Sequence, residues 1–246
     1  MAPKVSIIVP CKSIGPFARE CVEHCGRLNY QDFEVFVLPD DATGTEQLNG
    51  AQIIPTGPMG PSAKRDLGAS IATGEILAFI DDDAFPRADW LANAVPAFSD
   101  DSIGAVGGPA VTPQSDGFLE KASGMVFQSL LGGGPHSYRY TPGPFKIIDD
   151  YPSCNLLVRK STFQRAGGFG TEYWPGEDTK LCLSITKELG ESIVYVPNAL
   201  VYHHRRNLFR GHVNQVKSYA LHRGYFVKRY PETSRRFNYF LPSFLL

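Results

Sequence analysis

The chain has few cysteines, and none of them belongs to a recognisable motif. Its five cysteines are an odd number and include no C-x-x-C pair, which excludes a disulfide framework and a zinc signature. Cys21 and Cys25 lie one helical turn apart, so we expect them to be packing residues. No secretory signal precedes the first predicted strand, which starts close to Met1. We therefore expect the reducing cytosol as the compartment.

Long apolar runs and a large net charge are also missing. No segment approaches the ~20 apolar residues that a membrane span requires, and 24 basic against 25 acidic residues leave a formal net charge of -1. The charge is unevenly distributed, because residues 203–236 contain nine Lys and Arg residues and one acid, Glu232. This basic arm predicts an anionic partner such as a phosphate or membrane headgroups. We expect no nucleic-acid partner.

An aromatic and apolar tail, residues 237–246, follows the basic arm. Two alternatives stay open for this tail: it approaches a membrane, or it packs against its own domain. Together, the arm and the tail favour a cytoplasmic protein that associates peripherally with the cytoplasmic face of a membrane.

Two common phosphate-binding fingerprints are absent. The chain has no G-x-G-x-x-G and no G-x-x-x-x-G-K-[ST], which argues against a dinucleotide fold and a P-loop. Short apolar runs and amphipathic segments are present instead. The predicted strands are Val5–Pro10, Phe33–Leu38, Ala51–Pro55 and Ile76–Ile80, and the predicted helices begin at Pro16 and span Ser62–Ala72, with Ser62 as N-cap. This order predicts an α/β protein with a mainly parallel, Rossmann-like sheet flanked by helices.

Two of the predicted strands end in acidic clusters. Asp40 and Asp41 follow the second strand, and Asp81, Asp82 and Asp83 follow the fourth. Because parallel strands point their C-termini one way, we expect both clusters at one edge of the sheet, where ligands bind in open α/β folds. Carboxylates at this edge can accept hydrogen bonds from a nucleotide. They can also bind Mg²⁺ or Mn²⁺ together with the phosphates of a substrate. For the acidic triplet, a solvated turn is the competing interpretation.

The second half of the chain alternates less regularly. Its predicted helices are Ala88–Phe98, Phe118–Leu131, Thr179–Leu189 and Leu208–Tyr230, and its predicted strands are Ile103–Gly108, Ser153–Arg159, Ile193–Val196 and Ala199–Tyr202. Residues 132–144 are too rich in glycine and proline for regular structure. Because a loop of this length is usually functional, we interpret it as a lid on the acceptor side of a site.

Three further groups of residues suit catalysis or ligand binding. Asp178 lies in the first turn of its predicted helix and can act as a general base, although a capping acid is the competing interpretation. His203 and His204 alternate along a strand, so we expect at most one of them to face a site. Lys64 and Arg65 either hold a diphosphate or form a solvated basic pair.

Six short motifs occur in a characteristic order. They are Val5–Pro10, Leu38–Asp41, Ala63–Gly68, Gly74–Asp83, Gly167–Phe169 and Gly176–Asp178. In order and spacing they resemble the family-two glycosyltransferases of GT-A fold, over nearly the whole chain to about Arg206. The resemblance implies an inverting enzyme that uses a nucleotide-diphosphate sugar of the UDP or GDP type and Mg²⁺ or Mn²⁺. It also implies a glycan or a lipid-linked acceptor.

The resemblance implies a role for each matching residue on the nucleotide side. Asp41, with Asp40, would read the base, and Pro10 would line the base pocket. Lys64 and Arg65 would lie beside the base and the diphosphate. These five positions therefore form the expected donor-binding part of the site.

The same resemblance places the metal near the acidic triplet. Asp82 would hold the ribose, Asp83 would bind the metal, and Asp81 would support the loop. His203, or failing that His204, would complete the metal shell.

The catalytic step is also implied by the resemblance. Asp178 matches the base that removes the proton of the acceptor hydroxyl, and Arg205 or Arg206 would neutralise the leaving diphosphate. The chain departs from the family pattern where Cys11–Ser13 stands in place of an asparagine and Lys64–Asp66 in place of Ala-Arg-Asn.

We expect one GT-A domain, residues 1–206, followed by the basic helical arm and tail, residues 207–246. Residues 1–108 would bind the nucleotide sugar, and residues 109–206 would carry the acceptor and the catalytic base. Two alternatives stay open. A sugar nucleotidyltransferase would normally carry a glycine-rich basic loop after its first strand, and Pro10–Pro16 is a poor version of one. A non-catalytic nucleotide-sugar-binding module is the other.

Overall fold

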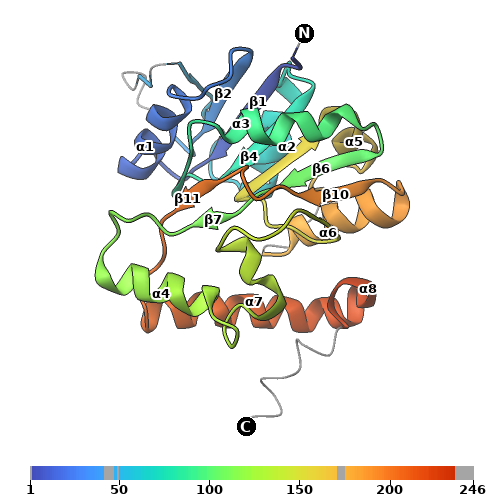
Figure 1. Cartoon of the computed structure of the whole chain (residues 1–246). Coiled ribbons are helices and arrows are strands. Elements are labelled where there is room, and N and C mark those ends of the chain that lie inside the picture. Colours follow the sequence, from blue (N-terminus) through green and yellow to red (C-terminus); the bar gives the residue numbers. More distant parts are fainter. Residues whose placement is uncertain (1, 42–46, 49, 171–174, 236–246) are drawn as a thin grey trace.

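The computed structural model describes residues 2–41, 47–48, 50–170 and 175–235, so the predicted aromatic tail, residues 237–246, lies outside the described part. The described residues form an α/β protein around one large sheet (Figure 1). Its strand order is β3-β2-β1-β4-β9-β6-β10-β8. In that order the strands span Gln52–Ile53, Phe33–Leu38, Val5–Pro10, Ile76–Ile80, Asn155–Arg159, Ile103–Gly107, Ser192–Tyr195 and Lys146–Ile148.

The first half of this sheet is parallel, as predicted. Val5 of β1 pairs with Phe33 of β2 and with Ile76 of β4, so all three strands end at the same edge. The second half is mixed, because β9 runs antiparallel to both β4 and β6. The chain leaves β6 at this edge, and β9 starts at the same edge, with Asn155 opposite Ile80. Without a crossover to the other end, the returning strand has to run antiparallel.

A second, three-stranded sheet lies beside the edge where β1 and β4 end. It has the order β5-β11-β7, and its strands span Ala84–Pro86, Val201–His203 and Ala110–Val111. The predicted strand Ala199–Tyr202 is therefore shifted and belongs to this small sheet. β5 and β7 are absent from the prediction because strands of two or three residues are too short to show a period.

Helices cover both faces of the large sheet. On β1, alternate residues such as Val5 and Ile7 pack on one face, in a core that includes the buried Cys21 and Cys25, while Ile8 packs on the other. The helices of the first face are α1 (Pro16–Cys25) and α3 (Trp90–Ala94); those of the second are α2 (Pro61–Ile71), α5 (Lys160–Arg165) and α6 (Glu177–Leu183). The two cysteines are thus packing residues, as predicted.

Several predicted helix boundaries were wrong, mostly beside proline. α2 begins at Pro61 with Gly60 as N-cap, not Ser62, because proline fits the first helical turn, where its missing N–H is not needed. In place of the predicted helix Ala88–Phe98 the structure has α3, which starts at Trp90, and a 3₁₀ turn, Val95–Ser99, that contains a proline. Residues 132–144 contain a 3₁₀ turn over residues 134–139 rather than no regular structure. The C-terminal half of the predicted helix Thr179–Leu189 is a π-helical turn, residues 184–188.

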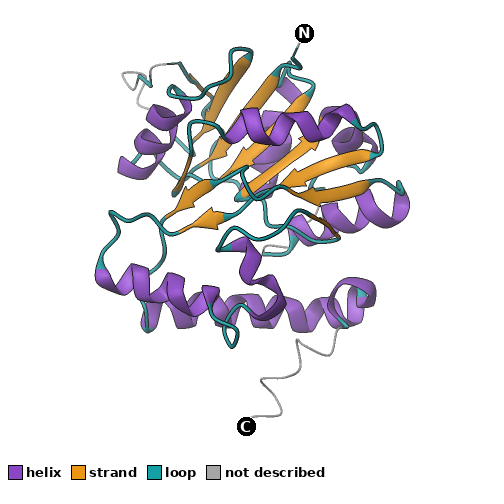
Figure 2. Cartoon of the chain, in the orientation of Figure 1, coloured by secondary structure: helices purple, strands orange, loops and turns teal. Residues whose placement is uncertain are grey.

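Two long helices form a separate layer below the sheets (Figure 2). They are α4 (Phe118–Gln128) and α7 (Arg210–Arg229), and the short α8 (Pro231–Ser234) follows α7. Ser123 Oγ of α4 lies 2.8 Å from His212 Nδ1 of α7, which joins the two helices. None of the helices among the described residues has both the length and the apolar character needed to cross a bilayer.

We predict that Asn155→Ala destabilises the fold strongly. The Asn155 amide is buried and donates to the carbonyl oxygens of Gly108 (2.7 Å) and Ala199 (2.8 Å), while its oxygen accepts from Trp90 Nε1 (2.8 Å). Loss of these bonds leaves buried groups unpaired, so the free energy of unfolding in urea should fall by about 3 kcal/mol. Asn93→Ala, which removes an exposed hydrogen bond, is the control. An equal loss in both variants would contradict the prediction.

Candidate active site

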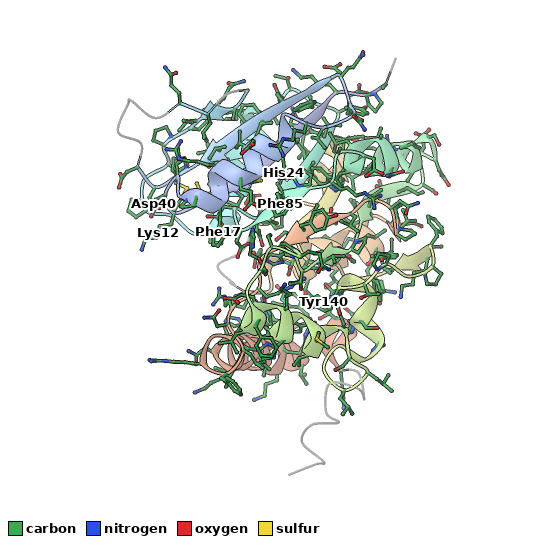
Figure 3. All side chains as sticks on the ribbon, turned by 60° about the vertical axis from the view of Figure 1, so that its left-hand side comes forward. Lys12, Phe17, His24, Asp40, Phe85 and Tyr140 are labelled. Carbon is green, nitrogen blue, oxygen red and sulfur yellow. The ribbon has the colours of Figure 1, made fainter. Side chains whose placement is uncertain are left out.

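Lys64 connects the ends of β1 and β2. It is 3% exposed, and its Nζ donates to the carbonyl oxygens of Cys11 (2.6 Å) and Leu38 (3.2 Å) and pairs with Asp40. Figure 3 shows Asp40 at this edge of the molecule. Asp41 follows and is exposed. The ammonium group of Lys64 is therefore already engaged by the protein, and the interpretation of Lys64 as a solvated base is wrong.

Arg65 is a buried cation that joins two distant segments. It is 4% exposed, and its Nη2 donates to Asp81 Oδ1 at 2.6 Å, after β4, while its Nη1 donates to Glu177 Oε1 at 3.0 Å, at the start of α6. Its guanidinium carbon lies 5.5 Å from the centre of the Phe169 ring. Burial alone would lower the pKa of Arg65, but the two carboxylates outweigh it and raise that pKa. Arg65, too, is not a solvated base.

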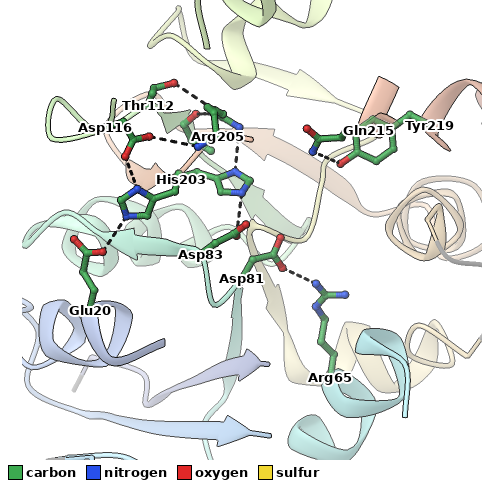
Figure 4. A network of polar contacts seen from close by, with 12 residues as sticks. Glu20, Arg65, Asp81, Asp83, Thr112, Asp116, His203, Arg205, Gln215 and Tyr219 are labelled. Atoms are coloured by element: carbon green, nitrogen blue, oxygen red, sulfur yellow. Dashed lines mark hydrogen bonds and ion pairs between the residues drawn. The ribbon is translucent and has the colours of Figure 1, made fainter. Parts of the chain in front are cut away.

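Asp81, Asp83 and His203 form a compact cluster of groups that bind metals. One potential ligand atom from each residue lies within 4.8 Å of the others. The two acids follow β4, and the pairing of β11 with β5 places His203 opposite Ala84. His203 Nε2 lies 3.1 Å from Asp83 Oδ1 (Figure 4). The cluster thus joins residues about 120 positions apart, through the sheet pairing of their strands.

The acids and the histidine shift one another's protonation. Burial and the neighbouring charges of Asp83 and Asp81 raise the pKa of Asp82 to about 6. Burial opposes ionisation of Asp83, but His203 outweighs it and lowers the pKa of Asp83. Burial would lower the pKa of His203, yet Asp83 raises it to about 10, while Arg205, whose Nη1 donates to His203 Nδ1, favours the neutral ring. A cation bound here would have to displace the proton on the Nε2 that faces Asp83.

His204 points away from this cluster. Its Nδ1 pairs with Asp116 and its Nε2 lies 2.9 Å from Glu20 of α1, and its ring stacks on Phe17 with centroids 4.6 Å apart. Only one of the two histidines faces the cluster, as the strand alternation predicts. The contacts of His204 instead connect α1 to the segment after β7.

Asp178 is the second residue of α6 and lines a hollow of about 230 Å³ together with Asp81, Asp83 and His203. Its carboxylate accepts hydrogen bonds from the backbone N–H groups of Thr179 (2.8 Å) and, more weakly, Ser153 (3.4 Å). Burial, followed by the charges of Glu177 and Asp150, raises the pKa of Asp178 to about 7. A carboxylate with such a pKa is suited to accept a proton near neutral pH.

Part of the wall of this hollow comes from residues that could not be identified individually from the sequence. Tyr140, from the loop predicted to be a lid, lies on one side, and α7 contributes Asn214, Gln215, Ser218 and Tyr219. Figure 4 shows Gln215 and Tyr219 across from His203. The polar α7 residues recur at helical spacing, which is the signal that could have identified them. Pro10, Asp40, Asp41, Lys64 and Asp82 do not line the hollow.

A second, more open hollow of about 740 Å³ adjoins the first. The two share Asp83, His204, Arg205, Arg206 and Asn214, so they are continuous around the cluster. The shared lining includes the basic side chains of Arg205 and Arg206 next to Asp83. This arrangement fits a substrate with a negatively charged group.

Two solved glycosyltransferases share this arrangement of sheets and helical layers, which is the GT-A fold. The mannosyltransferase PcManGT from Pyrobaculum calidifontis, solved with GDP-Man and Mn²⁺, superposes with a TM-score of 0.66 at 22% identity, over 93% of this chain and 64% of that one. GalNAc-T7, solved with UDP, GalNAc and Mn²⁺, gives a TM-score of 0.65 at 17% identity, over 84% and 45%.

The sequence comparison identifies the family. The profile described as glycosyl transferase family 2 matches residues 6–165. The chain belongs to this family, which confirms the resemblance seen in the six motifs.

Curated relatives are similar over part of their length. The pre-mycofactocin glycosyltransferase of Mycobacterium tuberculosis is 28% identical over 173 residues, which cover 70% of this chain and 36% of the relative. The glucosyl-dolichyl phosphate glucuronosyltransferase of Haloferax volcanii is 26% identical over 156 residues, or 58% and 47%. The chain therefore spans between a third and a half of the length of these relatives.

We predict that Asp178 makes stability fall as the pH rises. Its pKa in the folded state, about 7, is above the ordinary 3.8, so its contribution is fully present below pH 3.8 and is lost as the pH rises toward 7. Between about pH 5 and 7, Asp178→Asn should gain about 1.4 kcal/mol of unfolding free energy per pH unit relative to the parent chain. Urea unfolding measures this difference. Asp101→Asn, which removes a fully exposed acid, should run parallel to the parent; the same behaviour in Asp178→Asn would refute the prediction.

Proposed function

We propose that the protein is an inverting glycosyltransferase that moves a sugar from a nucleotide-diphosphate sugar to an acceptor hydroxyl. The observation that carries this proposal is one shared hollow: Asp178, with a pKa near 7, lies in it together with Asp81, Asp83 and His203. Membership in glycosyl transferase family 2 supports the reaction class. The hollow supports the assignment of residues within it.

The cluster fits a divalent metal. Two carboxylate oxygens and one imidazole nitrogen within 4.8 Å of one another are a donor set suited to Mn²⁺ or Mg²⁺, and both solved relatives contain Mn²⁺. We assign Asp83 and His203 as direct ligands, with Asp81 supporting the loop through its ion pair with Arg65. When bound, such a cation would offset the charge of the donor diphosphate.

The donor would lie along the edge where β1, β2 and β4 end. Asp41, with Asp40, would accept hydrogen bonds from the base beside Pro10, and Asp82 would hold the ribose. Lys64 would act indirectly, since its buried ammonium group holds Asp40 and the ends of β1 and β2 in place. The relatives solved with GDP-Man and with UDP support a donor of the GDP or UDP type.

Asp178 would supply the base. Its carboxylate takes the proton of the acceptor hydroxyl while that oxygen forms a bond to the anomeric carbon. The bond from this carbon to the diphosphate breaks, and its electron pair leaves with the nucleotide diphosphate, whose charge Arg205 or Arg206 would offset. Attack from the face opposite the leaving group inverts the anomeric configuration.

The acceptor would enter from the side of residues 132–144 and α7. Tyr140 from the first segment and Gln215 and Tyr219 from the second line the hollow that holds Asp178. We propose that a glycan or a lipid-linked sugar contacts them. On this proposal residues 1–108 bind the donor, residues 109–206 provide the base, and the arm, residues 207–246, completes the acceptor side.

Asp178→Asn tests the proposal directly. The amide keeps the shape of the side chain but cannot accept the proton, so transfer should fall by about 10³-fold, while calorimetric binding of the donor with Mn²⁺ should remain within about twofold of the parent. Transfer is followed as release of nucleoside diphosphate from GDP- and UDP-sugars. Asp101→Asn, at an exposed position, should retain full activity.

Two outcomes would contradict this account. If Asp178→Asn loses donor binding as much as transfer, Asp178 is a binding residue and not the base. If the parent chain releases pyrophosphate from a nucleoside triphosphate and a sugar phosphate, it is a nucleotidyltransferase; if it binds donors without any turnover, it is a binding module.

A further inference from the structure

Large exposed apolar side chains lie on α4, directly after its C-terminal end and at the start of α7. Phe118 is 83% exposed, Leu130 85%, Leu131 97% and Phe209 70%, and Met125 and Val213 are also exposed. Scattered exposed leucines are common on proteins, whereas a contiguous group of this kind marks an interaction surface. We call the surface formed by these six residues the α4–α7 face.

The geometry of α4 explains why these side chains face outward. Its buried positions are Ser123, Gly124 and Phe127; Gly124 lies close against Thr112, and Phe127 packs on His212 of α7. Phe118 and Met125 are seven positions apart and lie on the opposite side. The apolar stripe of α4 is thus directed away from the core of its own chain.

Contacts between the helices make the α4–α7 face one surface. Ser123 and Phe127 of α4 both contact His212 of α7, and the N–H of Leu208 donates to the carbonyl oxygen of Leu119 at 3.2 Å. Phe209 follows with a φ of 69°, a conformation that non-glycine residues rarely adopt. This turn directs the Phe209 ring into solvent at the start of α7. The contacts between α4 and α7 have to offset the cost of this backbone conformation.

The charge of α7 identifies the partner. Its 20 residues include no acid and five Lys and Arg residues, of which Arg223 pairs with the buried Asp150 and so is not part of the exposed surface. Arg210 and Lys217 are exposed beside the apolar residues of the face. The whole chain has a formal net charge of -1, so this positive surface is a local feature. Exposed apolar groups together with basic side chains fit the interface of an anionic lipid bilayer, where the former insert and the latter meet headgroups.

We propose that the α4–α7 face docks on an anionic membrane surface. A second copy of the chain fits it less well, because a two-fold dimer would bring the exposed Arg210 and Lys217 of two acid-free α7 helices together. The docked face borders the larger hollow, whose lining includes Leu119, Phe209 and Arg210 as well as Asp83. The membrane would therefore lie at the entrance to the candidate site. The docking itself does not depend on the transferase assignment.

Vesicle co-sedimentation of the 246-residue chain tests the proposal. Vesicles of phosphatidylcholine mixed with phosphatidylserine should pellet the protein, and vesicles of phosphatidylcholine alone should pellet far less. Binding should weaken as salt is raised, because salt screens the basic side chains. Leu131→Glu should reduce the partition coefficient by about tenfold or more, since it removes an inserted leucine.

Ile71→Glu is the matched control. It places the same charge at an exposed aliphatic position on α2, outside the face, and should bind as the parent chain does; thermal unfolding of both variants verifies their folding. Equal pelleting with neutral and anionic vesicles, or equal binding by Leu131→Glu and Ile71→Glu, would overturn the proposal. So would a lipid-free dimer in sedimentation velocity that Leu131→Glu dissociates, because a second copy would then cover the face.

Discussion

The candidate site depends on the burial of one guanidinium group. Arg65 pairs with Asp81 after β4 and with Glu177 at the start of α6. Removing such charges from water costs several kcal/mol per ion, and only pairing offsets this cost. The two acids are therefore held together once the core has formed. Because Asp83 and Asp178 are close neighbours of these acids in the chain, the same ion pairs set the distance between the proposed metal ligand and the proposed base.

A second buried charge connects the C-terminal arm to this arrangement. Asp150 is 6% exposed, and its carboxylate lies 3.4 Å from Arg139 and 3.5 Å from Arg223 of α7, while Thr179 Oγ1 donates to it at 3.0 Å. Thr179 directly follows Asp178. The arm, the loop after α4 and the helix of the proposed base thus meet at one carboxylate, whose charge also raises the pKa of Asp178. The helix α7 is for this reason packed against the candidate site.

The features that could be predicted from the sequence are those that depend on a local pattern of residues. The apolar runs of β1, β2 and β4 and the acids that follow them are adjacent in the chain, so their shared edge could be inferred from parallel pairing alone. The antiparallel entry of β9 and the small sheet that brings His203 to Asp83 depend on contacts between distant segments, and no short pattern records them. For the same reason the sequence left open whether Lys64 and Arg65 hold a diphosphate or form a solvated pair; in the fold both are buried and paired with carboxylates. The α7 residues that line the hollow could not be identified from the sequence, because that required knowing where the helix docks.

The central claim is that Asp83 and His203, from segments far apart in the chain, hold one cation next to the proposed base. Anomalous scattering from crystals grown with Mn²⁺ and GDP or UDP measures this most directly. The account predicts one manganese peak within bonding distance of Asp83 and His203, touching the diphosphate, with Asp178 open to the same hollow and Asp81 still paired with Arg65. A peak elsewhere on the chain, or a diphosphate bound away from this cluster, would contradict it.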